Sequence, residues 1–430
     1  MVIAIIKRLR GSRLVRNTAW MFLGQGLRTV IQAAYFILIA RSLGSRNYGA
    51  FVGVCALVAI VSPFAGLGGG SLLIKNVARS AESFGRYWGR ALLVLLITGA
   101  VLLCVVLGVS GYVFPASIPF MLVLVVSVTD LFFSRAMDIC SQAFQAFERL
   151  EKTAQILVIP NFLRLAAIAG LGLMVKAPTA LQWGYLYLLT TMISLSISLW
   201  LVHKELGSPV FLSSGLKGEH AEGFYFSAGL SAQSIYNDID KTMLTRFSTL
   251  SSAGIYSAAY RIIDVSFAPV RSLLYASYAR FFRYGEDGIK GSMGFARKVL
   301  PVAGGYGVAG GLLLLMAAPL LPVVLGAQYM ETAEALRWLA PLPFIKALHY
   351  FAADSLTGAG FQGIRSGIQV FVAIFNVAIN LWLIPAYSWR GAAWSSLASD
   401  GLLALLLWQA LFILLHRQRA AEGIAAASGQ

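Results

Sequence analysis

The chain has 430 residues, of which 58% are hydrophobic and only 12% are charged. Soluble domains carry about 25% charged residues, so this composition excludes an ordinary soluble fold. The net charge of +16 would suit a nucleic acid, but the basic residues flank apolar segments and form no soluble basic domain. We therefore expect membrane lipids, and no nucleic acid, as the partners of this charge.

Apolar stretches of about 20 residues, long enough to cross a bilayer, recur from Asn17 almost to the C-terminus. Their links are short and the stretches lack the alternation of a membrane β-barrel. The sequence therefore predicts an all-α polytopic membrane protein with about twelve transmembrane helices. The predicted spans are residues 17–40, 48–68, 88–111, 114–137, 153–174, 181–202, 222–246, 251–279, 299–321, 333–357, 364–387 and 391–415.

The longest link between spans divides the chain into two lobes of six helices. A weak echo supports the division, because Arg41 and Gly49 in the first half have the spacing of Arg246 and Gly254 in the second. The predicted segments are a basic N-terminus 1–16, an N-lobe 17–203, a link 204–221, a C-lobe 222–416 and a disordered tail 417–430. A second polar link is expected around 280–298.

The distribution of basic residues predicts the orientation. Of 34 lysines and arginines, six lie in the interior of predicted spans, six lie in links or at span ends on one side, and the other 22 lie in links or at span ends on the side of the N-terminus. Because basic residues concentrate on the cytoplasmic side, both termini, the link 204–221 and the link around 280–298 are predicted to be cytoplasmic. Lys176 and Arg246 are predicted to lie outside.

Ionisable residues within the spans are the candidate functional residues, since a charge at mid-depth costs about 2.5–3.5 kcal/mol unless water or a partner solvates it. At 100° per residue several of them share a helix face, which predicts polar stripes around a central cationic cavity. The stripes are Gln25, Arg28, Gln32 and Tyr35; Gln233, Asn237 and Asp240, with Lys241 at the edge; Arg261, Asp264, Arg271 and Tyr275; and Lys346, Tyr350 and Asp354. Arg164 lies in a further span.

A cationic cavity suits an anionic substrate such as a phosphate or pyrophosphate. The predicted substrate-binding residues are Gln25, Arg28, Gln32, Arg164, Arg261, Arg271 and Lys346. Six acids lie within the spans and could bind a coupling proton or sodium ion, or could form salt bridges: Asp130, Asp238, Asp240, Asp264, Asp354 and Asp400. Of these, Asp238, Asp240, Asp264 and Asp354 are the predicted coupling residues. Arg261 and Asp264, three residues apart, could neutralise each other. The three cysteines and four histidines make no ligand cluster, so we expect no metal, no cofactor and no catalytic residue.

Long segments of the chain resemble a known family. The stretches LIARSLGSRNYGAFVGVCALVAIVSPFAGLGGGSLLIKNVAR (38–79) and NDIDKTMLTRFSTLSSAGIYSAAYRIIDVSFAPVRSLLYASYARFFR (237–283) are similar to Wzx-type polysaccharide flippases. The resemblance implies the multidrug/oligosaccharidyl-lipid/polysaccharide exporter fold, with two six-helix lobes forming a V. It implies a flippase for undecaprenyl-pyrophosphate-linked oligosaccharides, with Arg28, Arg261 and Arg271 on the pyrophosphate or an acidic sugar. A polysaccharide polymerase and a chain-length regulator would be further partners.

Three alternatives stay open. A multidrug antiporter of the same superfamily typically has acids in its N-terminal lobe, whereas the first span here carries Arg28 and no acid. A lipid II flippase usually has two further helices. A membrane glycan polymerase or ligase, which would be an enzyme, needs a large external loop, and the external links here are about a dozen residues at most. The sequence favours a transporter over an enzyme.

Overall fold

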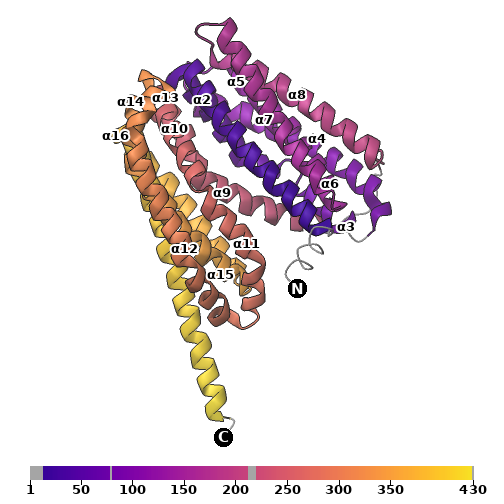
Figure 1. The fold of residues 1–430 in the computed structure, drawn as a ribbon, viewed down its shortest axis with the longest axis vertical. Helices are drawn as coiled ribbons and strands as arrows, with labels where there is room; N and C mark the ends of the chain where they lie inside the picture. Colours follow the sequence, from indigo (N-terminus) through magenta and orange to yellow (C-terminus); the bar gives the residue numbers. More distant parts are fainter. Residues whose placement is uncertain (1–12, 78–79, 212–218, 429–430) are drawn as a thin grey trace, which may run out of the picture. The chain divides into compact units, whose positions relative to one another are not determined.

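The computed structural model describes the backbone of residues 13–77, 80–211 and 219–428. Every regular element in this part is helical (Figure 1), which confirms the predicted all-α membrane fold. The chain divides into two compact units, unit 1 (Met1–Ser234) and unit 2 (Ile235–Gln430). The division falls within a helix, α9, and not in the link that the sequence suggested.

Unit 1 begins with a helix that bends sharply at Gly44, whose φ of 70° suits a residue without a side chain. The bend separates the first two predicted spans. A π-helical segment, η3, joins two α-helices into the fourth span. The elements of unit 1 are α2 (Arg13–Val61), η1 (Ser62–Phe64), α3 (Gly69–Val77), η2 (Ala81–Ser83), α4 (Phe84–Val113), α5 (Phe120–Val128), η3 (Thr129–Ser134), α6 (Arg135–Ala146), α7 (Leu150–Met174) and α8 (Ala180–Glu205).

Several helices of unit 2 are short or interrupted, although its last helix spans 67 residues. Pro269 begins α11 directly after α10, because proline fits the first turn of a helix but not its interior. The elements are α9 (Glu219–Phe247), which enters from unit 1, α10 (Leu250–Ser266), α11 (Ala268–Gly285), α12 (Gly288–Ala317), η4 (Ala318–Leu320), α13 (Leu321–Leu325), η5 (Ala327–Tyr329), α14 (Met330–Leu339), α15 (Leu342–Gly358) and α16 (Gln362–Ser428). The last of these bends at Ser388, which separates the final two predicted spans.

Two expectations about polar segments were wrong. The link around 280–298 is reduced to the turn at Glu286 and Asp287, because α11 and α12 continue beyond their apolar parts. The tail after residue 416 is not disordered as far as Ser428, since it continues α16. Its side chain Gln418 donates to the carbonyl of Asp287 over 2.9 Å. In both places polar residues extend a helix, and polarity alone does not distinguish that from a loop.

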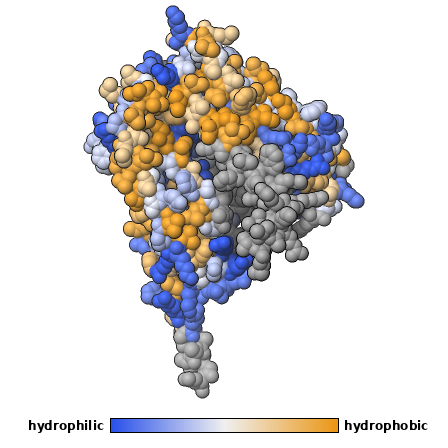
Figure 2. Space-filling model, viewed as in Figure 1, coloured by the Kyte–Doolittle hydropathy of each residue, from blue (hydrophilic) through white to orange (hydrophobic). Residues whose placement is uncertain are grey.

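The surface suits a lipid environment. Seven helical stretches in the described residues are long and apolar enough to cross a membrane. Large apolar side chains lie exposed along α4 and α12, where water would disfavour them. Figure 2 shows apolar side chains over much of the viewed face. The protein is therefore a multi-pass membrane protein. The exposed apolar residues on these two helices include Leu96, Ile97, Val101, Val302, Leu312, Leu313 and Met316.

Candidate functional site

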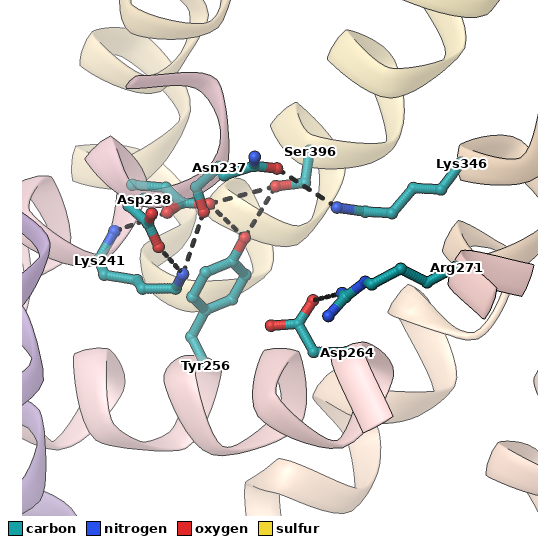
Figure 3. Close-up of polar contacts among 9 residues, drawn as sticks. Asn237, Asp238, Lys241, Tyr256, Asp264, Arg271, Lys346 and Ser396 are labelled. Atoms are coloured by element: carbon teal, nitrogen blue, oxygen red, sulfur yellow. Dashed lines mark hydrogen bonds and ion pairs between the residues drawn. The ribbon is translucent and has the colours of Figure 1, made fainter. Parts of the chain in front are cut away.

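A cluster of charged side chains lies inside unit 2, where α9, α10, α11, α15 and α16 meet (Figure 3). On α9, Lys241 is 8% exposed and its Nζ donates to the Asn237 carbonyl over 3.0 Å and to the Asp238 carboxylate. The ammonium also lies 4.6 Å from the ring centre of Tyr260. Lys241 is thus held by a local ion pair, a carbonyl and an aromatic face.

Asp240, on the same helix, is a buried acceptor that is well supplied with donors. Its carboxylate accepts hydrogen bonds from the Tyr256 hydroxyl, from Ser396 Oγ over 3.2 Å and from the Lys241 amide over 2.8 Å. Tyr256 and Ser396 also bond each other over 2.7 Å. Because a buried carboxylate without donors would be costly, this network fastens α9 to α10 and α16.

Three cations of the cluster have few partners. Lys346 Nζ, on α15, donates to Asn237 Oδ1 over 3.4 Å and lies 5.0 Å from the Tyr260 ring centre, which leaves two of its three donors unused by these contacts. Arg271 Nη2 lies 3.9 Å from Asp264 Oδ1, a loose contact between half-exposed side chains. Arg261 has no hydrogen bond or ion pair with another described residue. Figure 3 shows Lys346 and Arg271 extending toward α9 and α10. These three side chains are the candidates for binding an anion.

The structure brings only some residues of the predicted stripes into contact with each other. Asp264 contacts Arg271 and not Arg261, so the alternative that Arg261 neutralises Asp264 is wrong. Arg261 and Asp264 lie three residues apart on the same helix, α10, and this spacing permits a contact without ensuring it. Arg271, on α11 beyond the break at Phe267, is the side chain that lies near Asp264. A single straight helix over 251–279 would not have this break.

Asp354 lies apart from these residues. Its Oδ1 accepts from Arg365 Nη1 over 3.3 Å, and the same nitrogen donates to Thr357 Oγ1 over 2.7 Å. Both charged side chains are largely buried, at 9% and 17% exposure. The pair joins α15 to α16 and supports the salt-bridge interpretation that the sequence left open for this acid.

A second polar site lies in unit 1, around a pocket of about 280 Å³. Gln32 Nε2 donates to Asn161 Oδ1 over 3.2 Å, and both residues line the pocket. Arg164 also lines it, donating to Thr191 Oγ1 over 3.0 Å with its guanidinium 4.3 Å from the Tyr187 ring centre. The Nε atom of Arg164 is buried without a hydrogen-bond partner among the described residues. The predicted residues Gln32 and Arg164 thus share one pocket.

Asp130 completes this pocket, and the sequence reasoning had not placed it among the site residues. It lies in the π-helical segment η3, a kind of helical irregularity that is frequent at functional sites. Its Oδ1 accepts from the Tyr187 hydroxyl over 2.6 Å and from Ser134 over 3.1 Å. One signal could have found it, because Asp130 is an acid in an otherwise very apolar stretch.

The pairing of His349 with Asp400 was also missed. His349 Nε2 lies 3.1 Å from Asp400 Oδ1, between α15 and α16 of unit 2. Fifty-one residues separate them in the chain, so no local pattern could pair them. Two further predicted residues, Gln25 and Arg28, have side chains outside the described residues. The binding and coupling roles of all the predicted residues stay predictions.

Comparisons with known proteins agree with the sequence resemblance. Three solved structures are similar over nearly the whole chain. An inward-facing multidrug resistance MATE family transporter of the MOP superfamily is 14% identical, with 90% of this chain and 96% of that chain covered and a TM-score of 0.75. An outward-facing transporter of that description is 14% identical, with 95% and 98% covered and a TM-score of 0.63. A MATE structure in complex with MaD3S is 15% identical, with the same coverage and TM-score.

At these identities the likeness establishes the fold. No curated protein sequence matches the chain. The model of the family described as polysaccharide biosynthesis protein matches residues 14–277, which is more than half of the chain. Its match covers unit 1 and the beginning of unit 2, where α9, α10 and most of α11 carry the charged cluster. The chain is a membrane protein with the fold of MOP-superfamily transporters, and it belongs to the polysaccharide biosynthesis protein family.

Proposed function

We propose that the protein is a flippase that moves undecaprenyl-pyrophosphate-linked oligosaccharides across the bacterial inner membrane by alternating access. The observation that carries the proposal is the presence of Arg261, Arg271 and Lys346 in one unit with few partners. A pyrophosphate offers several anionic oxygens, and arginine and lysine bind such groups by charge-assisted hydrogen bonds. The membership of the polysaccharide biosynthesis family supports a sugar-bearing substrate.

The pocket of unit 1 suits a polar ligand such as a sugar. Amide, hydroxyl, carboxylate and guanidinium groups from Gln32, Asn161, Ser134, Asp130 and Arg164 line it. Sugars present many hydroxyl groups, each of which both donates and accepts, and such a mixed lining suits them. Arg28 and Gln25 would extend the binding surface from the first helix, as the sequence predicts.

Energy for the cycle would come from an ion gradient or from the substrate gradient, since the chain has no phosphate-binding glycine-rich loop. Of the four acids proposed for coupling, Asp264 has the loosest partner and the greatest freedom to bind a cation. Asp238, Asp240 and Asp354 are held by the contacts described above. Both termini would be cytoplasmic, and a polymerase and a chain-length regulator would act on the delivered units, making O-antigen, capsule or exopolysaccharide.

Export of cationic drugs is a second candidate function. The similar solved structures include multidrug resistance transporters, and Asp130 places an acid in the pocket of unit 1. A cation entering this pocket would also meet the guanidinium of Arg164, which repels it. This repulsion favours an anionic or neutral polar ligand, so we rank cation export below lipid-linked sugar transport.

The test is transport by the purified protein in vesicles. Undecaprenyl pyrophosphate carrying a fluorescent oligosaccharide is placed in both leaflets, and an impermeant quencher reports the fraction reaching the outer leaflet. The wild type should equilibrate the lipid much faster than protein-free vesicles, and Lys346→Met should abolish the difference. Lys204→Met, at the exposed end of α8, is the matched control. Movement of a cationic dye but not of the lipid would replace the proposal by the second candidate.

A further inference from the structure

Two buried titratable side chains in unit 2 face each other beside the anion-binding cations. His349 and Asp400 are 1% and 5% exposed, and 3.1 Å separates Nε2 of one from Oδ1 of the other. Yet neither atom makes a hydrogen bond of acceptable geometry with any described residue. Buried polar atoms are nearly always satisfied, because leaving one unsatisfied costs about 1–3 kcal/mol. Two such atoms at contact distance would gain an interaction if a proton bound to the pair.

The charges of the cluster balance before any substrate binds. Four basic side chains and four acidic ones lie in it, so the formal sum is zero. The basic ones are Lys241, Arg271 and Lys346, with Arg261 counted because it lies on α10 three residues before Asp264. The acidic ones are Asp238, Asp240, Asp264 and Asp400. A pyrophosphate would add at least one uncompensated negative charge. Beside the buried members of the cluster, Lys346, Asp240 and Asp400, such a charge is costly unless a proton accompanies it.

Only one acid of the four lies beside a group that can receive this proton near neutral pH. Asp238 is paired with Lys241, Asp240 has its three donors, and Asp264 lies against Arg271. Asp400 lies instead against His349, and histidine is the side chain that ordinarily changes charge near neutrality. Protonation would give the imidazolium a carboxylate neighbour and so a new ion pair.

The other groups that face the pair would not take up this proton. The ring centre of Tyr350, on α15, lies 4.5 Å from that of His349, with the two rings tilted. Tyr236 on α9 and Tyr260 on α10 interact electrostatically with Asp400. Tyrosines stay neutral at physiological pH. On α16, Arg365 acts on His349 but is engaged by Asp354, and Lys346 lies one turn before His349 on α15. An anion bound to Lys346 would therefore change the electrostatic environment of the His349–Asp400 pair.

We propose that the His349–Asp400 pair is a proton-binding site coupled to anion binding at Lys346. One proton from solvent enters the pair, forming imidazolium at His349, when a pyrophosphate group binds. This inference rests on the proposed anion binding but adds a site that the predicted coupling acids did not include. By linkage the effect is reciprocal, so a proton on the pair strengthens anion binding. Affinity would then increase by up to about tenfold for each unit of pH decrease across the titration.

The experiment is calorimetric titration of the full-length protein in nanodiscs with farnesyl pyrophosphate. Runs in two buffers of different ionisation enthalpy give the number of protons taken up per bound probe. The wild type should take up a proton near neutral pH, approaching one per site at its maximum. His349→Gln should bind without this uptake and lose the pH dependence of affinity. Asp400→Asn removes a negative charge, so it should bind more tightly, with reduced uptake.

The matched control is His416→Gln, an exposed histidine on α16, which should keep the uptake of the wild type. If His349→Gln does not fold, Asp400→Asn tests the proposal alone. Binding without proton uptake in the wild type, or uptake that persists in both variants, would overturn the proton site and leave the flippase proposal standing. Failure of the wild type to bind the probe from about pH 6 to about pH 8 would overturn both.

Discussion

Substitution of Arg271 can distinguish a substrate-binding role from a structural one, because the contact of Arg271 with Asp264 is weak. The two charged atoms are 3.9 Å apart and the side chains are 46% and 38% exposed. An ion pair of this exposure contributes at most about 1 kcal/mol to stability. A guanidinium hydrogen-bonded to a phosphate oxygen contributes about 1.5–3 kcal/mol to binding. At 1.36 kcal/mol per factor of ten, its loss corresponds to a roughly 10- to 150-fold weaker affinity.

The perturbation is Arg271→Ala, alone and combined with Asp264→Asn, with farnesyl pyrophosphate binding and thermal unfolding as the two measurements. We expect Arg271→Ala to weaken binding by that factor while changing the free energy of unfolding by less than about 1 kcal/mol. The double variant should bind as weakly as the single one. Arg283→Ala, in the last turn of the same helix, is the control.

The reasoning would be refuted by recovery in the double variant. If Arg271 serves only to neutralise Asp264, removing both charges should restore the affinity that the single substitution lost, as a double-mutant cycle detects. Arg261 provides an independent comparison, since it has no ion-pair partner among the described residues. Arg261→Ala should therefore weaken binding with no dependence on Asp264.

Three further predictions concern packing, the buried network and topology. Gly391→Ala should destabilise the protein by about 1–3 kcal/mol in thermal unfolding, because the added Cβ would lie 2.2 Å from a backbone carbonyl oxygen. Gly401→Ala, on the same helix, is the control, since its Cβ would meet open space and the change should be neutral or slightly stabilising. Tyr256→Phe should cost about 1–3 kcal/mol by leaving a buried carboxylate short of one donor; an unchanged melting temperature would contradict this. A cysteine at Lys290 should react with an impermeant thiol reagent only from the cytoplasmic side, and one at Lys176 only from outside; reversed labelling would refute the orientation.

The sequence predicted the helices well because bilayer thickness imposes a length and an apolar content on each span. It could not predict the breaks within them. Gly44 and Ser388 bend helices whose two halves correspond to separate predicted spans. Pro269, by contrast, divides a segment predicted as continuous. Whether a proline bends a helix or begins a new one depends on the packing around it, which helical periodicity does not report.

The sequence predicted which residues belong to the candidate site better than it predicted which of them contact each other. Lys346 was placed on an inward face, and it is 4% exposed beside Asn237 and Tyr260. Asp264 was given the wrong possible partner, because a spacing of three residues on one helix permits a contact without ensuring it. His349 was dismissed as one of four scattered histidines, since its partner Asp400 lies on another helix. Pairings between helices depend on rotation and register, which a single sequence does not contain.

The burial of these charges also explains why they form a balanced set. A lone buried charge costs several kcal/mol, so a membrane protein that needs cations for an anionic substrate must hold acids near them in the empty state. In unit 2 the acids are graded by how firmly they are held. Asp240 has three donors, Asp238 has the ammonium of Lys241, Asp264 has one loose contact, and Asp400 faces a histidine. An incoming anion can displace only the weaker of these contacts, so Asp264 would yield Arg271 to the substrate while Asp240 keeps α9, α10 and α16 together.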